Sequence, residues 1–307
     1  MFFSIKKCTV LHTSIACIFF AAASLLPAQI QEITPPVPPA VRAVVNAYKN
    51  EQLQAGYDIE RRDWVIRVPT ADGAALFYWA GGRLLPEELL DEADSYRTLV
   101  YPYPTEIPDP ANFTQEDIAR YSRSGDTENR RNAPLQYPGF LDAIYDSATQ
   151  ASIEEHIQTV LFLGKYVTVH EKIVEPLERV EEKIAQRART DAETAEFVET
   201  LSRTDGYLWR EIRDTGSRSF HSYALAIDVL PEGWGREIVY WNWEKNKGND
   251  EWMLIPLEDR WIPPLAVISI FESEGFIWGG KWGIWDNMHF EYRPELILLQ
   301  QYSGQQS

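Results

Sequence analysis

The 307-residue sequence predicts an α+β fold, because its strand-like and helix-like segments are grouped rather than regularly alternating. Short β-like runs occur early, at residues 63–68 and 74–79, and again in the last third, at 225–230 and 237–243. Between these groups, residues 150–203 carry apolar residues at helical spacing. Hydrophobic residues form 45% of the chain, which is enough to bury a sizeable core.

Residues 1–28 have the layout of a secretory signal peptide. Two lysines precede an apolar stretch from about Val10 to Leu26, and small residues then lead to Ala28. A membrane anchor is the alternative, but the stretch is short and is interrupted by polar residues. A lipid anchor at Cys17 is disfavoured, because much of the apolar run follows it. We therefore expect export to the periplasm, the cell envelope or the medium, with no stable membrane span after removal of the signal.

Cysteine usage and charge exclude several classes of function. Cys8 and Cys17 both lie in the signal segment, so the mature chain would have no disulfide, no thiol nucleophile and no cysteine metal ligand. The net charge is −17, and loss of the two lysines at the start makes it −19. Such a chain is repelled by nucleic acid and by anionic membrane surfaces, and we expect neither as a partner.

Residues 29–149 are predicted to form an N-terminal region of uncertain fold. It begins with a proline-rich linker, in which four prolines within residues 35–39 predict extended chain. Helical periodicity follows from residue 40 to 54, and the two early β-like runs come next. After a second proline-rich loop, Asn112 or Thr114 is the predicted cap of a helix.

Residues 150–307 are predicted to form a second domain, which begins with the helical stretch of residues 150–203. Nine of the eleven tryptophans follow, between Trp209 and Trp285. The apolar run at residues 265–271 is followed by Glu-Ser-Glu-Gly, which favours a helix that ends at Gly275. Tryptophans at this density are expected mainly in the core, with a substrate groove as the alternative.

Four histidines follow the signal segment. His156 and His170 lie in the predicted helical stretch among apolar and charged neighbours, and we expect ordinary helix-surface or core-edge roles for both. The other two, His221 and His289, each lie within seven residues of a carboxylate and amid apolar and aromatic residues. These two segments are therefore the candidates for chemistry.

The residue types in the two segments are those of a metal site. His221 and Asp228 belong to Ser-Phe-His-Ser-Tyr-Ala-Leu-Ala-Ile-Asp, and Asp286 precedes His289 by three residues. Imidazole nitrogens and a carboxylate oxygen suit Zn²⁺, and three protein ligands leave a fourth position for water. Asp228 interrupts an apolar run, where a carboxylate is costly unless it is paired or binds a metal. On composition alone, a structural aspartate with satisfied hydrogen bonds remains the alternative.

The combined motifs resemble those of the zinc D-alanyl-D-alanine peptidases, which include the vancomycin-resistance D,D-peptidases and the L-alanyl-D-glutamate endopeptidases of phage and bacteria. That family's pattern is Ser-x-His-x-x-Gly-x-Ala-x-Asp, followed later by Asp/Glu-x-x-His. The positions of this sequence that match are Ser219, His221, Ala226, Asp228, Asp286 and His289. The resemblance covers roughly residues 150–303. Ala224 stands where the family has glycine, which predicts a modest local change in the loop between the first two ligands.

The resemblance implies a hedgehog/D,D-peptidase-like fold, in which helices pack on a small, mainly antiparallel sheet that carries a zinc site, with residues 29–149 as an N-terminal extension. It also implies that one Zn²⁺ is bound by His221, Asp228 and His289. The general base would be Asp286, which takes a proton from water and passes it to the leaving amine.

The remaining site residues follow from the same resemblance. An upstream arginine is expected to stabilise the tetrahedral intermediate; Arg210 is the first candidate, with Arg213 and Arg218 as alternatives. Ser219 is expected to hydrogen-bond near the site. If the end of the chain is a strand, Glu291 shares a face with His289 and either orients that ligand or pairs with Arg293.

The implied function is hydrolysis of peptide bonds in peptidoglycan stem peptides, with a D-alanyl-D-alanine carboxypeptidase as the first expectation. An L-alanyl-D-glutamate endopeptidase or another zinc amidase is one alternative. A wall-binding module without catalysis on the same fold is the other, and an intact base at Asp286 argues against it.

Overall fold

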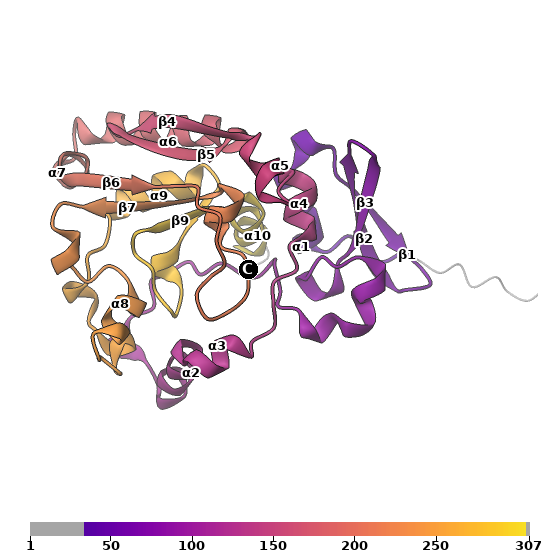
Figure 1. Cartoon of the computed structure of the whole chain (residues 1–307), viewed down its shortest axis with the longest axis horizontal. Helices are drawn as coiled ribbons and strands as arrows, with labels where there is room; N and C mark the ends of the chain where they lie inside the picture. The colour runs from indigo at the N-terminus through magenta and orange to yellow at the C-terminus, as the bar shows by residue number, and fades with distance from the viewer. Residues whose placement is uncertain (1–33, 305–307) are drawn as a thin grey trace, which may run out of the picture. The chain divides into compact units, whose positions relative to one another are not determined.

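The computed structural model describes residues 34–304, which form helices and small antiparallel sheets (Figure 1). The predicted signal segment at residues 1–28 lies outside the described residues. The strands are β1 (Gln54–Asp58), β2 (Asp63–Thr70), β3 (Gly73–Tyr78), β4 (Ile157–Phe162), β5 (Lys165–His170), β6 (Leu201–Asp205), β7 (Ala226–Pro231), β8 (Phe276–Trp278) and β9 (His289–Tyr292). The α-helices are α1 (Pro39–Ala47), α2 (Gln115–Gly125), α3 (Thr127–Arg131), α4 (Gly139–Tyr145), α5 (Gln150–Glu154), α6 (Val174–Ala188), α7 (Ala192–Thr200), α8 (Trp241–Asn246), α9 (Leu265–Ser273) and α10 (Pro294–Gly304).

The first sheet is an antiparallel meander in the order β1-β2-β3, as the two early β-like runs predicted for β2 and β3. Helix α1 precedes it and is shorter than the predicted helix over residues 40–54. A 3₁₀ turn follows α1, and Gln52 then adopts a left-handed backbone with φ 55°, which ends the helical path before β1. The second predicted helix start is confirmed at Thr114, whose hydroxyl accepts from Asp117 N in a capping box.

The prediction of helix throughout residues 150–203 is wrong for residues 157–170 and for the last residues, where β6 begins at Leu201. Residues 157–170 form the β4–β5 hairpin, whereas α5, α6 and α7 are helical as expected. Leu163 and Gly164 have φ 47° and 78°, the backbone of a two-residue hairpin turn. Val167 and Val169 alternate inward along β5 and are buried. The β-branched residues and the turn therefore outweigh an apolar spacing that also fits a helix.

The predicted strand at residues 237–243 is also wrong, because α8 begins within it at Trp241. Tyr240 makes only an isolated bridge with Asp286. The Trp241 ring packs against that of Trp252, with 4.6 Å between ring centroids, and both are buried. Packing of these aromatic rings, rather than a strand ladder, decides the local structure.

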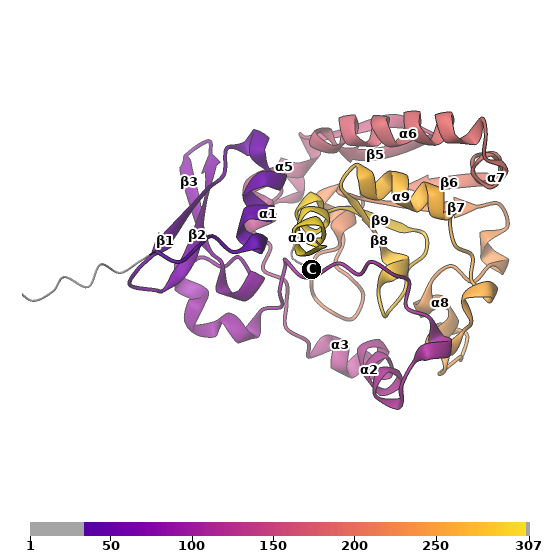
Figure 2. The ribbon, with the colours of Figure 1, turned by 180° about the vertical axis from the view of Figure 1, so that it is seen from behind.

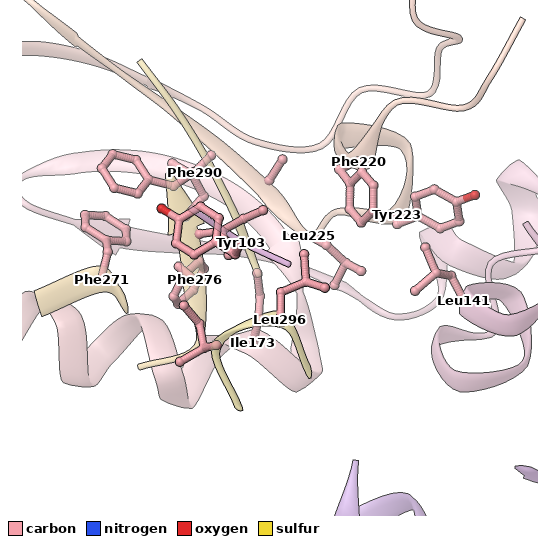
Figure 3. Packing of buried hydrophobic residues seen from close by; sticks show 14 of the residues in the cluster. Tyr103, Leu141, Ile173, Phe220, Tyr223, Leu225, Phe271, Phe276, Phe290 and Leu296 are labelled. Carbon is pink, nitrogen blue, oxygen red and sulfur yellow. The ribbon is translucent and has the colours of Figure 1, made fainter. Parts of the chain in front are cut away.

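The central sheet has the order β6-β7-β9-β8 and is antiparallel throughout. Helix α9, predicted from the run at residues 265–271, lies across one face of it (Figures 1 and 2). The Phe271 ring of α9 stacks on Phe290 of β9 at 3.9 Å between centroids (Figure 3). Ile227 and Phe290 are register partners on this core face, so the residues that alternate with them point to the other face.

The early part of the chain packs against the late part. Val41 and Val44 of α1 share one buried core with Leu296 of α10, and the described residues 34–304 belong to one compact unit. The Tyr48 hydroxyl donates to Glu295 Oε2 at 2.8 Å within this contact. None of the helices within residues 34–304 has the length and apolar character needed to span a membrane.

Candidate metal centre

His221 is held with one ring nitrogen free. It lies in the 3₁₀ turn Phe220–Tyr223, where the Ser219 hydroxyl accepts from His221 N at 3.4 Å. The ring Nδ1 lies 2.6 Å from the carbonyl oxygen of Gly206, so Nδ1 carries the proton and donates it. The opposite nitrogen, Nε2, is buried and has no hydrogen-bond partner. Its lone pair is therefore available to a metal ion.

Asp228 and His289 face the same point from neighbouring strands. They are direct register partners on β7 and β9, on the sheet face opposite Phe290. Asp228 Oδ1 lies 2.8 Å from His289 Nδ1 and 3.3 Å from His221 Nε2. One potential ligand atom from each of the three residues lies within 4.8 Å of the others, and the group could hold a metal ion.

The geometry of this group fits a small cation. The 3.3 Å separation between His221 Nε2 and Asp228 Oδ1 does not make a hydrogen bond. It does equal the spacing of about 3.3 Å expected between two tetrahedral ligand atoms that each lie about 2.0–2.1 Å from Zn²⁺. A buried nitrogen that lacks a donor, set beside a half-buried carboxylate, is a polar arrangement that a cation satisfies.

The electrostatics of Asp228 and His289 agree with this arrangement. Burial by itself raises the pKa of Asp228, but the facing imidazoles of His221 and His289 lower it well below its ordinary value. Burial lowers the pKa of His289, whereas its hydrogen bonds to Asp228 and Glu291 raise it well above the ordinary value. The carboxylate of Asp228 thus stays ionised in the buried site.

Glu291 supports the His289 ring from behind. Because β9 is a strand, Glu291 shares a face with His289, and its Oε1 lies 3.1 Å from His289 Nε2. Its other oxygen lies 3.6 Å from Arg293 Nη1, so both predicted partners of Glu291 are found. Arg293 also pairs with Glu295 at 2.6 Å. This chain of charges fixes the ring so that Nδ1 faces the centre.

Asp286 lies beside the centre with an unpaired oxygen. Its amide donates to the Gly279 carbonyl at 3.1 Å, and its carbonyl accepts from His289 N at 3.3 Å. Its Oδ1 is buried without a partner. Burial raises the pKa of Asp286 to about 8, with Asp228 and Glu291 adding to the increase. The nearby positive charges of His289 and Arg210 oppose this rise.

The structure distinguishes two of the three candidate arginines, Arg210 and Arg218. Arg210 is exposed, and its charge is one of those that lower the pKa of Asp286. Arg218 is already engaged: its Nη1 donates to Asp142 at 2.7 Å, and its guanidinium lies over the rings of Trp209 and Tyr223. Arg210 is therefore better placed than Arg218 to act at the centre.

Three supporting residues had not been predicted. Gly206 supplies the carbonyl that orients His221, and a side chain there would collide with the Thr168 carbonyl, because an added Cβ would lie 2.1 Å from that oxygen. Ser222 accepts from Arg210 N at 2.8 Å and donates to the Arg210 carbonyl. Tyr240 forms the bridge to Asp286.

Of the nine tryptophans from Trp209 to Trp285, four are buried and five are half-buried, so they divide between the core and its edge. Trp278 and Trp285 are buried. Trp282 is half-buried, and its ring lies 5.6 Å from that of His289 between centroids. His156 and His170 take no part in the centre and lie in and beside the β4–β5 hairpin rather than on a helix.

The fold and the site together define a mixed helix-and-sheet protein with a buried His/Asp/His group. Comparison with known families agrees with this class: residues 213–292 match the model of D-alanyl-D-alanine carboxypeptidase, a range that contains all three candidate ligands and Asp286. This match supports a metal-dependent peptidase of that kind. Residues 40–101 match the model of a domain of unknown function. Neither a curated protein nor a solved structure matches the chain.

Proposed function

We propose that this chain is an exported zinc peptidase that removes the terminal D-alanine from peptidoglycan stem peptides, on a hedgehog/D,D-peptidase-like fold. One observation carries the proposal. His221 Nε2, Asp228 Oδ1 and His289 Nδ1 converge beside the unpaired carboxyl of Asp286, inside the range that matches the D-alanyl-D-alanine carboxypeptidase model.

Zinc is the metal that this donor set suits. Two imidazole nitrogens and one carboxylate oxygen form a three-ligand set typical of catalytic zinc. When bound, Zn²⁺ would act as a Lewis acid toward the scissile carbonyl and make water more acidic. The Gly206 carbonyl and the Glu291 carboxylate hold the two rings in the orientation that binding needs.

The residues around the metal would have separate roles in proton transfer and in stabilising the developing negative charge. A cation bound beside Asp286 would lower its raised pKa and favour the carboxylate form, and its free oxygen would then accept a proton from the attacking water and return it to the leaving amine. Arg210 would stabilise the negative charge that develops on the substrate carbonyl oxygen. Its backbone is held by Ser222 and by Ser219, whose amide donates to the Arg210 carbonyl at 3.1 Å.

The first test is mass spectrometry of defined stem peptides that end in D-alanyl-D-alanine, incubated with the protein with and without a zinc chelator. We expect loss of one alanine, abolished by the chelator and restored by Zn²⁺. An internal cut would instead assign an L-alanyl-D-glutamate endopeptidase. A folded, zinc-loaded protein that yields no product would overturn the proposal in favour of a binding module.

The second test separates the base from the metal site. Asp286→Ala should lower kcat by about 10²–10⁴-fold, the usual contribution of a general base, while the protein still binds one zinc ion. The control is Asp72→Ala, at an exposed position in the β2–β3 turn, which should keep full activity. Wild-type turnover in Asp286→Ala would show that Asp286 is not the base.

A further inference from the structure

A pocket outside the metal centre is lined by basic side chains. Its volume is about 340 Å³, and its charged and aromatic lining consists of Arg130, Arg131, Arg213, Lys245, Asp214 and Trp241. Four basic residues against one acid leave a local charge of +3, in a chain whose net charge is −17. Positive charge is therefore concentrated in this pocket against the trend of the molecule.

Most of this positive charge has no carboxylate partner. Arg131 pairs with Asp214 at 3.4 Å. Arg130 instead donates to the Arg213 carbonyl at 3.2 Å and lies over the Trp241 ring at 5.3 Å. Lys245 donates to a backbone carbonyl, that of Gly125.

The guanidinium of Arg213 makes no hydrogen bond or ion pair within the described residues. Three cations of the pocket thus remain without a counter-charge, and an anionic group is the ligand that they would bind most strongly.

The pocket adjoins the segment that holds Asp286. Trp241 N donates to the Trp285 carbonyl at 3.2 Å, and the preceding Tyr240 forms the bridge to Asp286. An extended peptide advances about 3.3 Å per residue, so a chain of a few residues bound at the metal centre can reach a neighbouring pocket. Arg130 and Arg131 lie on α3, outside the range that matches the carboxypeptidase model.

We propose that this pocket binds a side-chain carboxylate of the peptide substrate, an inference that rests on the proposed peptidase function. Guanidinium groups form two parallel hydrogen bonds to a carboxylate, and the Trp241 ring offers an apolar wall to the carbon chain that bears it. A protein with net charge −17 otherwise repels an acidic peptide, so a local cationic pocket is needed to bind one. The substrates would then be peptides with a free acidic side chain rather than neutral ones.

The test compares two peptides that differ only in one side chain, which is a free carboxylate in one and a carboxamide in the other. For the wild-type protein we expect kcat/KM for the acid to exceed that for the amide by about tenfold or more, as a charged hydrogen bond contributes. Arg130→Gln and Arg213→Gln should each bring this ratio close to one, and Arg213→Lys should keep part of it. The matched control is Arg67→Gln, an exposed arginine on β2, which should leave the ratio unchanged.

A binding measurement separates this inference from the proposed reaction. Calorimetric titration of the zinc-loaded Asp286→Ala protein with the same two peptides should show tighter binding of the acid, and this preference should be lost when Arg213→Gln is added. If the acid peptide binds more tightly but the wild type hydrolyses neither peptide, the carboxylate-binding role of the pocket is supported and the proposed peptidase reaction is refuted. If the wild type hydrolyses both peptides equally well, the proposed carboxylate-binding role of the pocket is refuted. Displacement of the acid peptide by an equal concentration of inorganic phosphate would show a simple anion site and overturn the assignment to a peptide carboxylate.

Discussion

Acidification should destabilise the segment beside the metal centre through one buried imidazole, that of His170. The residue is 1% exposed, its Nε2 donates to the Tyr145 carbonyl at 3.1 Å, and its Nδ1 accepts from Lys172 N at 3.1 Å. The second bond requires the neutral ring, because a protonated Nδ1 has no lone pair to accept a hydrogen bond. Burial is the main cause that lowers the pKa of His170 to about 4, and the positive charge of Lys172 lowers it further.

The size and sign of the effect follow from the two pKa values. In the unfolded chain the imidazole titrates at about 6.5, so between pH 6.5 and 4 the unfolded state binds a proton that the folded state does not. The stabilisation is fully present above pH 6.5 and is lost as the pH falls toward 4. The difference between the pKa of His170 in the unfolded chain and in the folded protein corresponds to about 3 kcal/mol of unfolding free energy. The His170 amide also donates to the Ala224 carbonyl at 2.9 Å, in the turn between His221 and Asp228.

The assay is urea denaturation of the wild type and of His170→Asn at several pH values between 4 and 7.5. Asparagine keeps an acceptor for Lys172 N and does not titrate. The difference in unfolding free energy between the two proteins should fall by about 3 kcal/mol as the pH drops through this interval. Parallel pH profiles would refute the reasoning.

His156→Asn serves as the control of opposite sign. Glu171, through its hydrogen bond, raises the pKa of His156, so the contribution of His156 is present at low pH and is lost as the pH rises through its folded pKa. This variant should therefore lose stability relative to the wild type mainly at low pH.

Four further substitutions, at three positions, test the support of the site. Glu291→Gln should weaken zinc binding by about 10–100-fold in a chelator competition, because the carboxylate behind His289 is lost; unchanged affinity would contradict that role. Ala224 has φ 53° and is buried, so Ala224→Gly should change stability by less than about 1 kcal/mol, since relief of a left-handed backbone offsets the lost methyl group. Ala224→Val should destabilise by about 2–3 kcal/mol in the same denaturation assay. An added Cβ at Gly279 would lie 2.6 Å from the Asp286 carbonyl oxygen, so Gly279→Ala should lower kcat about tenfold or more with zinc content retained. A Gly279→Ala enzyme with normal kcat would show that this contact does not position the base.

Local sequence patterns predicted the secondary structure correctly where the stabilising interactions lie within one short segment. The capping box at Thr114 and the helix from Leu265 are of this kind, because their hydrogen bonds and apolar spacing lie within a few residues. The failure at residues 157–170 has a physical reason as well. Apolar residues in this short stretch fit both a helix and a hairpin, and the turn at Leu163 and Gly164 decided between them.

The sequence by itself named the residues that form the candidate metal-binding group. The resemblance of the two motifs to the zinc D-alanyl-D-alanine peptidases named His221, Asp228 and His289, and alternation along a strand put Glu291 on the face of His289. The motif also marked Ala224 as the position where a glycine is usual, and its backbone is indeed left-handed.

Only the tertiary structure decided what surrounds this group. The Gly206 carbonyl behind His221 and the engagement of Arg218 by Asp142 depend on segments 15 and 76 residues apart. The basic pocket likewise joins Arg130 of α3 to Trp241 of α8. Such contacts depend on how helices and sheets pack against one another, and the spacing of residues within a short segment does not encode that packing. Side chains on the same strand or the same turn, by contrast, are placed by the backbone that connects them.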